Sequence, residues 1–337
     1  MQAIQAAKNA LTNVLDASSG EYVVIICDQE KTQIANAFTA AALEVGLWTR
    51  LVVLPKTAQP RTEIPETLQK ALKGNVNIFI NLLSGNREET PFRIKLIKQQ
   101  TQSHKSRLGH CPGVTLDMLT LGALALTPKE HEMMQSHAQK LMRALQDVAT
   151  VQITNPKGTN LTLSVKNREF YSDTKLNWET MKWMNLPTGE VIVAPVEDSL
   201  NGKLVCDMAV GGIGKLRAQL EAVAENGKVK TVTCQDEDQL KRIKETFATD
   251  QWSDIVGEFA FGINPKARVT DEFLEAEKIL GTVHVAFGAN TDMPGGKNAS
   301  KNHMDILISK PTVKVTKQNR QTFTVLENGK YSDNRAE

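Results

Sequence analysis

The chain has 337 residues, enough for two domains of ordinary size, each with a core of its own. Its 40 lysine and arginine residues nearly balance 38 aspartate and glutamate residues, and aromatic residues make up only 5% of the chain. This composition argues against nucleic acid or an acidic membrane surface as a partner, because neither would be attracted electrostatically.

The N-terminal stretch 1–15 has an amphipathic helical pattern and lacks the continuous apolar core of a signal peptide. No run approaches the roughly 18 apolar residues that cross a bilayer. The four cysteines form no CxxC pair, which favours reduced thiols. We therefore expect a cytoplasmic protein that does not bind membranes.

The first part of the chain alternates helical and strand patterns. Helices are expected near 2–17, 31–45 and 66–73, and strands at 22–27, 50–54 and 75–83. Gly46 supplies the stop signal of the second helix. Alternation of this kind predicts a parallel sheet covered by helices. A long helix over 128–147, opened by Pro128, closes an N-terminal α/β domain at residues 1–147.

Residues 148–337 carry short strand-like runs instead, typical of a β-rich α+β domain. The runs VATVQITN and LTLSV flank PKGTN and predict a hairpin. Six more runs follow: EVIVAPVE, KLVCDMAV, KVKTVTC, IVGEFAFGI, TVHVAFGA and HMDILIS. Turns are expected at Asn201-Gly202, Asn226-Gly227 and Asn328-Gly329, and helices at 236–249 and 271–280.

Two motifs resemble known sites without meeting their requirements. In HEMMQ (131–135) the second histidine of a zinc-protease helix is replaced by Gln135, so a solvated helix face is expected. GGIGK (211–215) lacks the Ser or Thr that completes a phosphate loop, which favours a plain glycine turn.

The segment 185–305 carries the side chains that point to chemistry. Glu190 opens a strand, Glu258 lies within one, and Glu277 is expected on a helix. His284 lies in the next apolar run. His303 and Asp305 are two residues apart on a strand, so they point to the same face and can hold one ion together.

Burying these groups without partners would cost several kcal/mol. No buried basic partner appears in the strands that carry them. Several carboxylates with two imidazoles instead indicate divalent cations, which keep carboxylates ionised. A ligand set of oxygen and nitrogen without thiolate fits Zn, Co, Mn or Fe(II).

The succession NLPTGE, GEFAFG, EK, GTVHVAFG and HMD resembles the aminopeptidase T and aminopeptidase S group of M29-type metallopeptidases. GHCPG (109–113) and APVEDSLNG (194–202) resemble segments of relatives named leucyl aminopeptidases. The resemblance covers most of the chain. It implies an α/β domain before a β-rich metal domain, two divalent ions (Zn, Co or Mn), a homodimer, and a peptide or small-molecule substrate. The implied ligands are Glu190, Glu258, Glu277, His284, His303 and Asp305.

The sequence departs from this family at two positions. Asn290 stands where the family has a tyrosine, and it is expected to contact substrate in that place. Glu277 lies seven residues before His284, two more than the family spacing.

The tail GANTDMPGGKNASKNHMDI also resembles the ring-cleaving 2,5-dihydroxypyridine dioxygenases. That resemblance implies one Fe(II), held by a histidine where Glu258 stands here and by the HxD pair. Those enzymes lack counterparts of Glu190 and His284, which this chain has.

The first hypothesis is a dinuclear hydrolase that removes N-terminal residues from peptides, with Glu258 or Glu277 as general base. The alternative is a mononuclear Fe(II) oxygenase that uses His284, His303 and Asp305 as its triad. A repurposed member without peptidase activity is a third hypothesis.

The segment GHCPG is expected to form a tight loop after a strand. His110 would then either face solvent in a structural turn or contact substrate outside the metal's coordination shell.

Overall fold

The structure is a computed structural model that describes residues 1–102, 106–177 and 182–332. Its internal contacts define two compact units: unit 1 comprises Met1–Gln135 and Asp173–Thr188, and unit 2 comprises Ser136–Ser172 and Gly189–Glu337. A parallel α/β sheet in unit 1 and antiparallel sheets in unit 2 confirm the predicted fold class. The contacts assign residues 136–147 to unit 2, and the predicted domain boundary at 147/148 stays a prediction.

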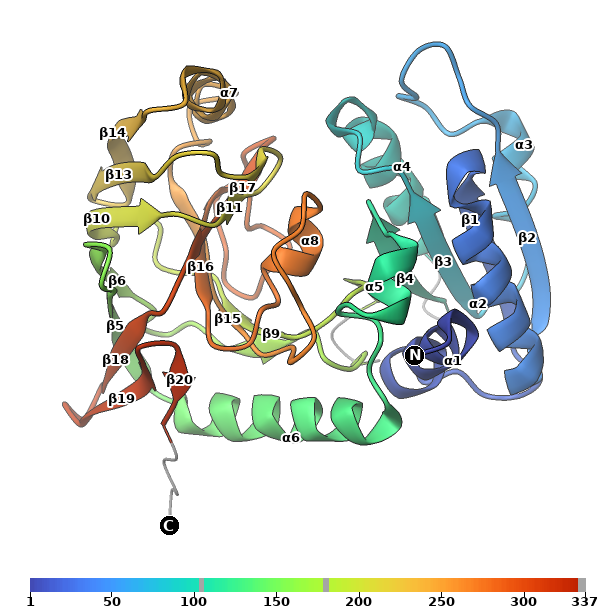
Figure 1. Ribbon diagram of the computed structural model, residues 1–337, viewed down its shortest axis with the longest axis horizontal. Helices are drawn as coiled ribbons and strands as arrows, with labels where there is room; N and C mark the ends of the chain where they lie inside the picture. The colour runs from blue at the N-terminus through green and yellow to red at the C-terminus, as the bar shows by residue number, and fades with distance from the viewer. Residues whose placement is uncertain (103–105, 178–181, 333–337) are drawn as a thin grey trace. The chain divides into compact units, whose positions relative to one another are not determined.

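Unit 1 is built on a five-stranded sheet of order β2-β1-β3-β4-β8, with every neighbouring pair parallel (Figure 1). Its strands are β1 (Tyr22–Asp28), β2 (Trp48–Leu54), β3 (Ile78–Leu83), β4 (Arg107–Pro112) and β8 (Trp183–Asn185). Its helices are α1 (Ala3–Asn9), α2 (Thr32–Val45), α3 (Glu66–Gln69), α4 (Thr90–Gln100), α5 (Leu116–Thr120) and the start of α6 (Pro128–Ala144). A π-helical turn follows α1 at Ala10–Val14, and 3₁₀ turns precede α2 and α4 at Gln29–Lys31 and Arg87–Glu89.

Strand β1 shows why the parallel strands read as continuous apolar runs. Val23, Ile25 and Cys27 belong to a core with α1, α2 and α5. Val24 and Ile26 belong to a second core with α3 and α4. Successive side chains point to opposite faces, so both faces of this sheet are buried and both sets must be apolar.

The tight loop expected for GHCPG is wrong, because residues 107–112 form β4. Gly109 packs closely there, since an added Cβ would lie 2.7 Å from Leu186 Cδ1 and this side chain would have to shift. The solvated helix face expected for HEMMQ (131–135) in α6 is found only in part. His131 is 3% exposed, and burial lowers its pKa to about 4. Its neighbours Glu132 and Met133 are the exposed residues of that motif.

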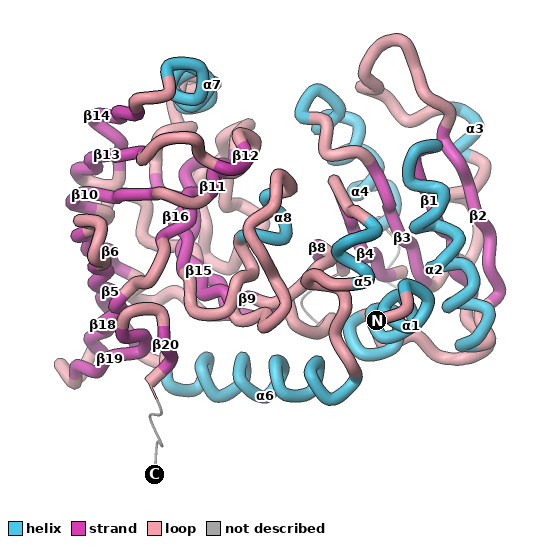
Figure 2. The backbone as a smooth tube through the Cα atoms, in the orientation of Figure 1, coloured by secondary structure: helices cyan, strands magenta, loops and turns pink. Residues whose placement is uncertain are grey.

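Unit 2 consists mainly of two antiparallel sheets (Figure 2). The eight-stranded sheet has the order β14-β13-β10-β6-β5-β18-β19-β20. Its strands are β5 (Val148–Thr154), β6 (Asn160–Ser164), β10 (Asn201–Cys206), β13 (Leu220–Glu225), β14 (Lys228–Cys234), β18 (Thr312–Lys317), β19 (Thr322–Glu327) and β20 (Lys330–Tyr331).

The seven-stranded sheet has the order β12-β11-β17-β16-β15-β9-β7. Its strands are β7 (Tyr171–Ser172), β9 (Glu190–Val193), β11 (Ala209–Val210), β12 (Gly214–Lys215), β15 (Val256–Gly262), β16 (Val283–Gly288) and β17 (His303–Ile308). The segment GGIGK provides the turn between β11 and β12, as predicted. Two helices complete the unit, α7 (Glu237–Phe247) and the short α8 (Phe273–Ala276).

Two of the three predicted Asn-Gly turns are confirmed. Asn226-Gly227 joins β13 to β14 and Asn328-Gly329 joins β19 to β20, all four residues having positive φ as a tight hairpin turn requires. Asn201-Gly202 is instead the start of β10. Gly202 has φ +116°, and an added Cβ would lie 2.1 Å from the carbonyl oxygen of Asn160.

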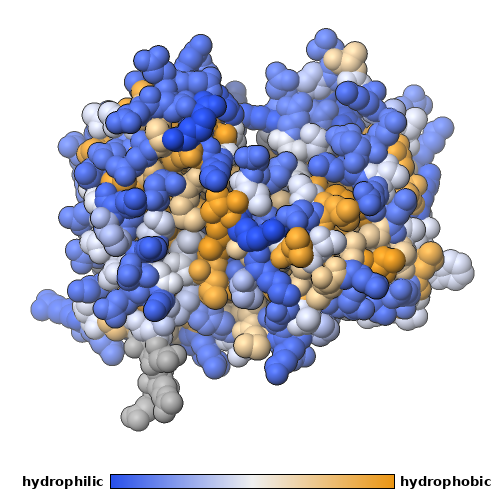
Figure 3. Space-filling view, viewed as in Figure 1, coloured by the Kyte–Doolittle hydropathy of each residue, from blue (hydrophilic) through white to orange (hydrophobic). Residues whose placement is uncertain are grey.

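The surface over α7 is mainly hydrophilic in Figure 3. Asp236 caps this helix by accepting a hydrogen bond from the backbone N–H of Gln239. No helix among the described residues is long and apolar enough to cross a membrane. The four cysteines are free thiols, as expected.

Candidate metal centre

Four neighbouring strands carry five of the six predicted ligands on one face of the seven-stranded sheet. Strand register aligns Glu258 with Ala286 and Ala286 with Asp305. Residues directly opposite one another, and residues two apart on one strand, share a face. The remaining pairs, Glu190–Gly262, Ala260–His284 and Gly288–His303, therefore place their side chains on the same face.

The residues between the predicted ligands on this face are small. Ala260, Gly262, Ala286 and Gly288 leave space above the sheet, while Phe259, Phe261 and Phe287 point to the other face and are buried. The sequences GEFAFG and VHVAFG encode this arrangement, since large apolar residues alternate with acidic, imidazole and small ones. This period-two pattern is a sequence signal for a polar face that extends beyond the His303–Asp305 pair.

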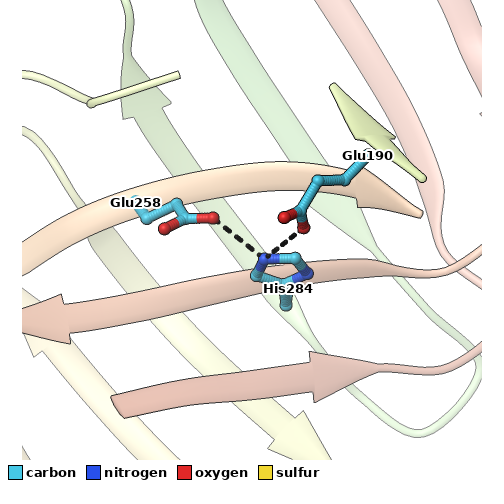
Figure 4. A group of neighbouring side chains, drawn as sticks. All are labelled: Glu190, Glu258 and His284. Carbon is cyan, nitrogen blue, oxygen red and sulfur yellow. Dashed lines mark hydrogen bonds and ion pairs between the residues drawn. The ribbon is translucent and has the colours of Figure 1, made fainter. Parts of the chain in front are cut away.

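His284 lies at the centre of the cluster and is 1% exposed. Its Nε2 atom is 3.0 Å from Glu258 Oε1 and 3.5 Å from Glu190 Oε2. Figure 4 marks both contacts with dashed lines. The same nitrogen lies 3.8 Å from Asp305 Oδ1. Three carboxylates from three different strands thus surround one imidazole nitrogen.

His303 forms the exposed side of the cluster, with a side chain 33% exposed. Its Nδ1 is 2.8 Å from the carbonyl oxygen of Ala289, which can only accept, so Nδ1 carries a proton and donates. The other nitrogen, Nε2, lies 3.2 Å from Glu258 Oε2 and 3.3 Å from Asp305 Oδ1. In metal sites, a ligating histidine commonly donates one ring N–H to a backbone carbonyl, which orients the other nitrogen toward the ion.

The ligand atoms form two groups that share Glu258. One group is Glu190, Glu258 and His284, and the other is Glu258, His303 and Asp305. Within each group the candidate atoms lie within 4.8 Å of one another. Buried carboxylate oxygens with imidazole nitrogens are a donor set that fits a divalent cation.

Glu277 lies outside both groups. It is the C-terminal cap of α8 rather than a residue within the predicted helix at 271–280. Its Oε1 accepts a hydrogen bond of 2.9 Å from Lys278 Nζ. Glu277, whose distance in sequence from His284 is two residues longer than in the family, thus contacts the next residue, Lys278.

Lys278 is the residue of the site that sequence reasoning missed. It is 1% exposed, and its ammonium group donates to Glu190 as well as to Glu277. The sequence shows no buried basic residue in the strands that carry the carboxylates. Lys278 was missed because it follows α8 and lies outside those strands. The available signal was the Glu-Lys pair directly before the apolar stretch ILGTVHVAFG.

Contacts within the cluster shift the metal-free ionisation of its members. Burial opposes the charged form of Glu258, but hydrogen bonds from His284 and His303 outweigh it and hold the pKa of this carboxyl far below its usual range. Burial likewise opposes the charged form of His284, yet the hydrogen bond to Glu258 and the surrounding carboxylates raise its pKa to about 9. Partial desolvation opposes the charged form of His303, but the charge of Asp305 and hydrogen bonds to Asp305 and Glu258 raise its pKa well above its usual value.

Glu277 shifts in the opposite direction from Glu258. Burial is the largest cause, and it raises the pKa of Glu277 to about 7 together with the charge of Asp305, against the lowering effect of Lys278. A carboxyl group with this pKa can accept a proton near neutral pH and release it again.

A bulge in β15 brings Glu258 into the cluster. The register with β16 shifts between Val256 and Glu258, so Gly257 is the extra residue. An added Cβ on Gly257 would lie 2.4 Å from the carbonyl oxygen of Gly288. Only glycine allows the two strands to approach this closely beside the site.

Asn290 is held inside the loop between β16 and β17 and is 0% exposed. Its amide donates to Glu197 and to the carbonyl of Gly257, and its oxygen accepts from the N–H of Asn298. These bonds favour a role in anchoring the loop over the substrate contact expected from the sequence.

His110 lies in β4 of unit 1 and is 4% exposed, so the solvent-facing imidazole expected in the structural interpretation is wrong. Its ring lies 3.5 Å from the Asn81 amide nitrogen and packs edge-on against Trp183. Burial, with a smaller contribution from Arg93, lowers its pKa to about 3. The substrate contact stays a prediction, and burial favours a structural role.

Comparisons with known proteins agree with this architecture. The sequence profile of the thermophilic metalloproteases (M29) matches residues 127–331, more than half of the chain. No curated protein matches the chain significantly.

Among solved structures, wild-type AmpT from Thermus thermophilus has a similar fold, with a TM-score of 0.71, 15% identity and 98% coverage of both chains. A 2,5-dihydroxypyridine dioxygenase from Pseudomonas putida KT2440 is similar too, with a TM-score of 0.69 and 16% identity. That comparison covers 99% of this chain and 98% of the dioxygenase. At these identities the two structures show the fold alone.

Proposed function

The chain belongs to the thermophilic metalloprotease family (M29), and from this premise we propose that it is a metal-dependent hydrolase that releases N-terminal residues from peptides. The observation that carries the proposal is the pair of ligand groups that share Glu258. A carboxylate common to two groups can bridge two divalent ions, as in dinuclear hydrolases. Zn, Co and Mn all suit the donor set.

The geometry supports separate roles for the two glutamates considered as general base. Each oxygen of Glu258 faces a different histidine, which suits a bridging ligand. Glu277 lies beside the ligand groups without belonging to either, a position that suits a base that takes a proton from the attacking water. Bound divalent ions would lower the pKa of that water and polarise the scissile carbonyl.

We propose a substrate with a free amino group because the sequence resembles aminopeptidases T and S. Glu190, Glu258, Glu277 and Asp305 belong to one cluster, in which Lys278 pairs with Glu190 and Glu277. Two bound divalent ions together with Lys278 would outweigh the charge of four carboxylates, so the preference for a free amino group does not rest on the net charge of the site. His303 is the exposed member, and we propose that substrate approaches on its side.

A second candidate function is a mononuclear Fe(II) oxygenase. The observation that favours it is the approach of both imidazole Nε2 atoms to Asp305 Oδ1, at 3.8 Å for His284 and 3.3 Å for His303. Two histidines and one carboxylate are the ligand set of many non-heme Fe(II) oxygenases. The full-length likeness in fold to the dioxygenase is compatible with it.

The test uses the full chain, stripped with a chelator and reloaded separately with Zn²⁺, Co²⁺, Mn²⁺ or Fe²⁺. Hydrolysis of short peptides with free and with acetylated N-termini is measured under anaerobic and aerobic conditions. We expect cleavage of the free peptides without dioxygen and none of the acetylated ones. Oxygen consumption coupled to loss of an aromatic substrate, with no peptide cleavage under any metal, would support the oxygenase instead. Inactivity in both assays would favour a repurposed member.

Two variants separate the proposed roles. Glu258→Gln should lose bound metal, because it removes the shared ligand. Glu277→Gln should keep its metal and lower kcat by about 100-fold or more, since it removes only the base. Glu225→Gln, an exposed position in the same unit, is the control. The assignment would be contradicted if Glu277→Gln lost its metal while Glu258→Gln kept a full metal content.

A further inference from the structure

Lys278 introduces an asymmetry into the two ligand groups. Its ammonium group donates to Glu190, a member of only one group, and to Glu277, a member of neither. Among the described residues no lysine or arginine pairs with Glu258 or Asp305, the carboxylates of the other group. One group therefore has a lysine ammonium group on one of its candidate ligands, and among the described residues the other group has none.

This cation cannot move away easily. Lys278 is 1% exposed, and a buried ammonium group must keep charged or hydrogen-bonding partners. An ion entering beside His284 would share Glu190 with Lys278, since Oε2 of this carboxylate faces His284 while Oε1 accepts from Lys278. The metal ion and the Lys278 ammonium group, both positive, would then bind opposite oxygens of the Glu190 carboxylate. They would repel each other, because the protein interior screens charge weakly.

The other group presents no such conflict. His303 Nε2 faces Glu258 Oε2 and Asp305 Oδ1 at 3.2 and 3.3 Å, and its second nitrogen is fixed by Ala289. His303 Nε2 and the two carboxylate oxygens are oriented for one ion, on the more exposed side of the cluster.

We propose that Lys278 is a resident cation that makes the two metal groups unequal. The group of Glu258, His303 and Asp305 binds one divalent ion tightly, and the group of Glu190, Glu258 and His284 binds a second ion at least 100-fold more weakly. The proposal rests on the metal site of the proposed function, but not on which reaction the site catalyses.

The test is a metal titration of the full-length, chelator-stripped protein with Zn²⁺ in buffers of fixed free concentration, read by elemental analysis after equilibrium dialysis. The wild type should retain one equivalent at low free Zn²⁺ and take up a second only at concentrations at least 100-fold higher. Lys278→Met should bring the second equivalent to within about tenfold of the first. Lys278→Arg, which keeps the positive charge, should behave like the wild type.

Two further variants complete the design. Lys230→Met removes an exposed lysine from β14 and should leave both equivalents as in the wild type. Glu190→Gln should keep the tight equivalent, because Glu190 belongs only to the weak group. Circular dichroism and melting temperature establish that each variant is folded, and similar affinities of the two equivalents in the wild type would overturn the proposal even if Lys278→Met does not fold.

Each outcome separates this inference from the proposed function. Two equivalents of similar affinity in the wild type, or unequal affinities that persist in folded Lys278→Met, would overturn the role of Lys278 and leave a metal enzyme in place. Absence of bound metal from the wild type at every concentration would overturn both.

Discussion

At the scale of single residues, the site depends on side chains that belong to two interactions at once. Glu258 faces two imidazoles, and Asp305 Oδ1 lies within 3.8 Å of both. Removing one such side chain leaves the others as close carboxylates or imidazoles without their counter-charge, so effects within this cluster should not be additive.

Replacement of either member of the same-face pair tests the tight metal position. His303→Ala and Asp305→Ala should each lose at least one metal equivalent, because each removes a ligand from the group that shares Glu258. Elemental analysis of the purified proteins measures the loss. Asp292→Ala, an exposed acidic position in the adjoining loop, should retain the wild-type content. Full occupancy in both ligand variants would refute the assignment.

His110 gives a pH dependence that is independent of metal. Burial lowers its pKa from 6.5 to about 3, so the folded state keeps the ring neutral while the unfolded chain binds a proton below 6.5. The resulting stability is complete above pH 6.5 and is lost as pH falls toward 3, by up to about 1.4 kcal/mol per pH unit.

His110→Gln should remove the contribution of this imidazole to the change of unfolding free energy with pH. The free energy of unfolding, measured with urea between pH 7 and pH 5, should fall less steeply in the variant than in the wild type. His131 shifts in the same direction and remains in both proteins, so only the difference between the two slopes reports on His110. Identical slopes would show that the imidazole is not buried in neutral form.

At the scale of elements, the position of Glu258 follows from the bulge in β15. An added Cβ at Gly257 would meet the backbone of Gly288, which cannot move aside as a flexible side chain can. Strand separation at this point would carry Glu258 away from His284 on β16.

Gly257→Ala should therefore lower metal affinity and cost about 1–3 kcal/mol of stability. Phe259→Leu is the matched control on the same strand, because Phe259 is buried on the opposite face. Phe259→Leu should also lose stability, because it alters packing, but it should keep its metal affinity. Equal metal affinities in Gly257→Ala and the wild type would show that the bulge does not position Glu258.

The loop between β16 and β17 supports the same site from the other side. Ala289, at its start, holds His303, and Asn290 ties the loop to Gly257 and Glu197. Asn290→Ala should cost about 1–3 kcal/mol, because buried groups lose their hydrogen-bond partners. Thermal unfolding measures this cost. A melting temperature equal to that of the wild type would contradict the anchoring role.

At the scale of the whole molecule, metal should stabilise one unit selectively. All the candidate ligands lie in unit 2, so an ion that binds only the folded state stabilises that unit by about 2.7 kcal/mol at 100 times its Kd. Hydrogen exchange followed by mass spectrometry should show slower exchange in β15, β16 and β17 on metal addition. Strands β1, β3 and β4 of unit 1 should not change, and uniform protection of both units would contradict this expectation. A homodimer stays a prediction, to be tested by light scattering.

The sequence by itself determined the class of fold and the chemical character of the site. Period-two alternation and Asn-Gly turns specify antiparallel strands, and continuous β-branched runs specify buried parallel ones. Ionisable residues within apolar strands, such as Glu258 and His284, imply a compensating charge because their burial is costly. These inferences depend on local pattern, which the sequence displays directly.

Only the tertiary structure decided which candidate ligands lie together and that a lysine side chain lies beside them. Lys278 is adjacent to Glu277 in sequence, but its contact with Glu190 joins residues 88 positions apart. The segment GHCPG (109–113) was expected to be a loop because Gly and Pro favour turns, whereas pairing with β3 and β8 makes residues 107–112 a strand. Asn290 looked available for substrate, and long-range hydrogen bonds buried it. Strand register and loop closure set these partners, and a linear pattern does not specify contacts between residues that are distant along the chain.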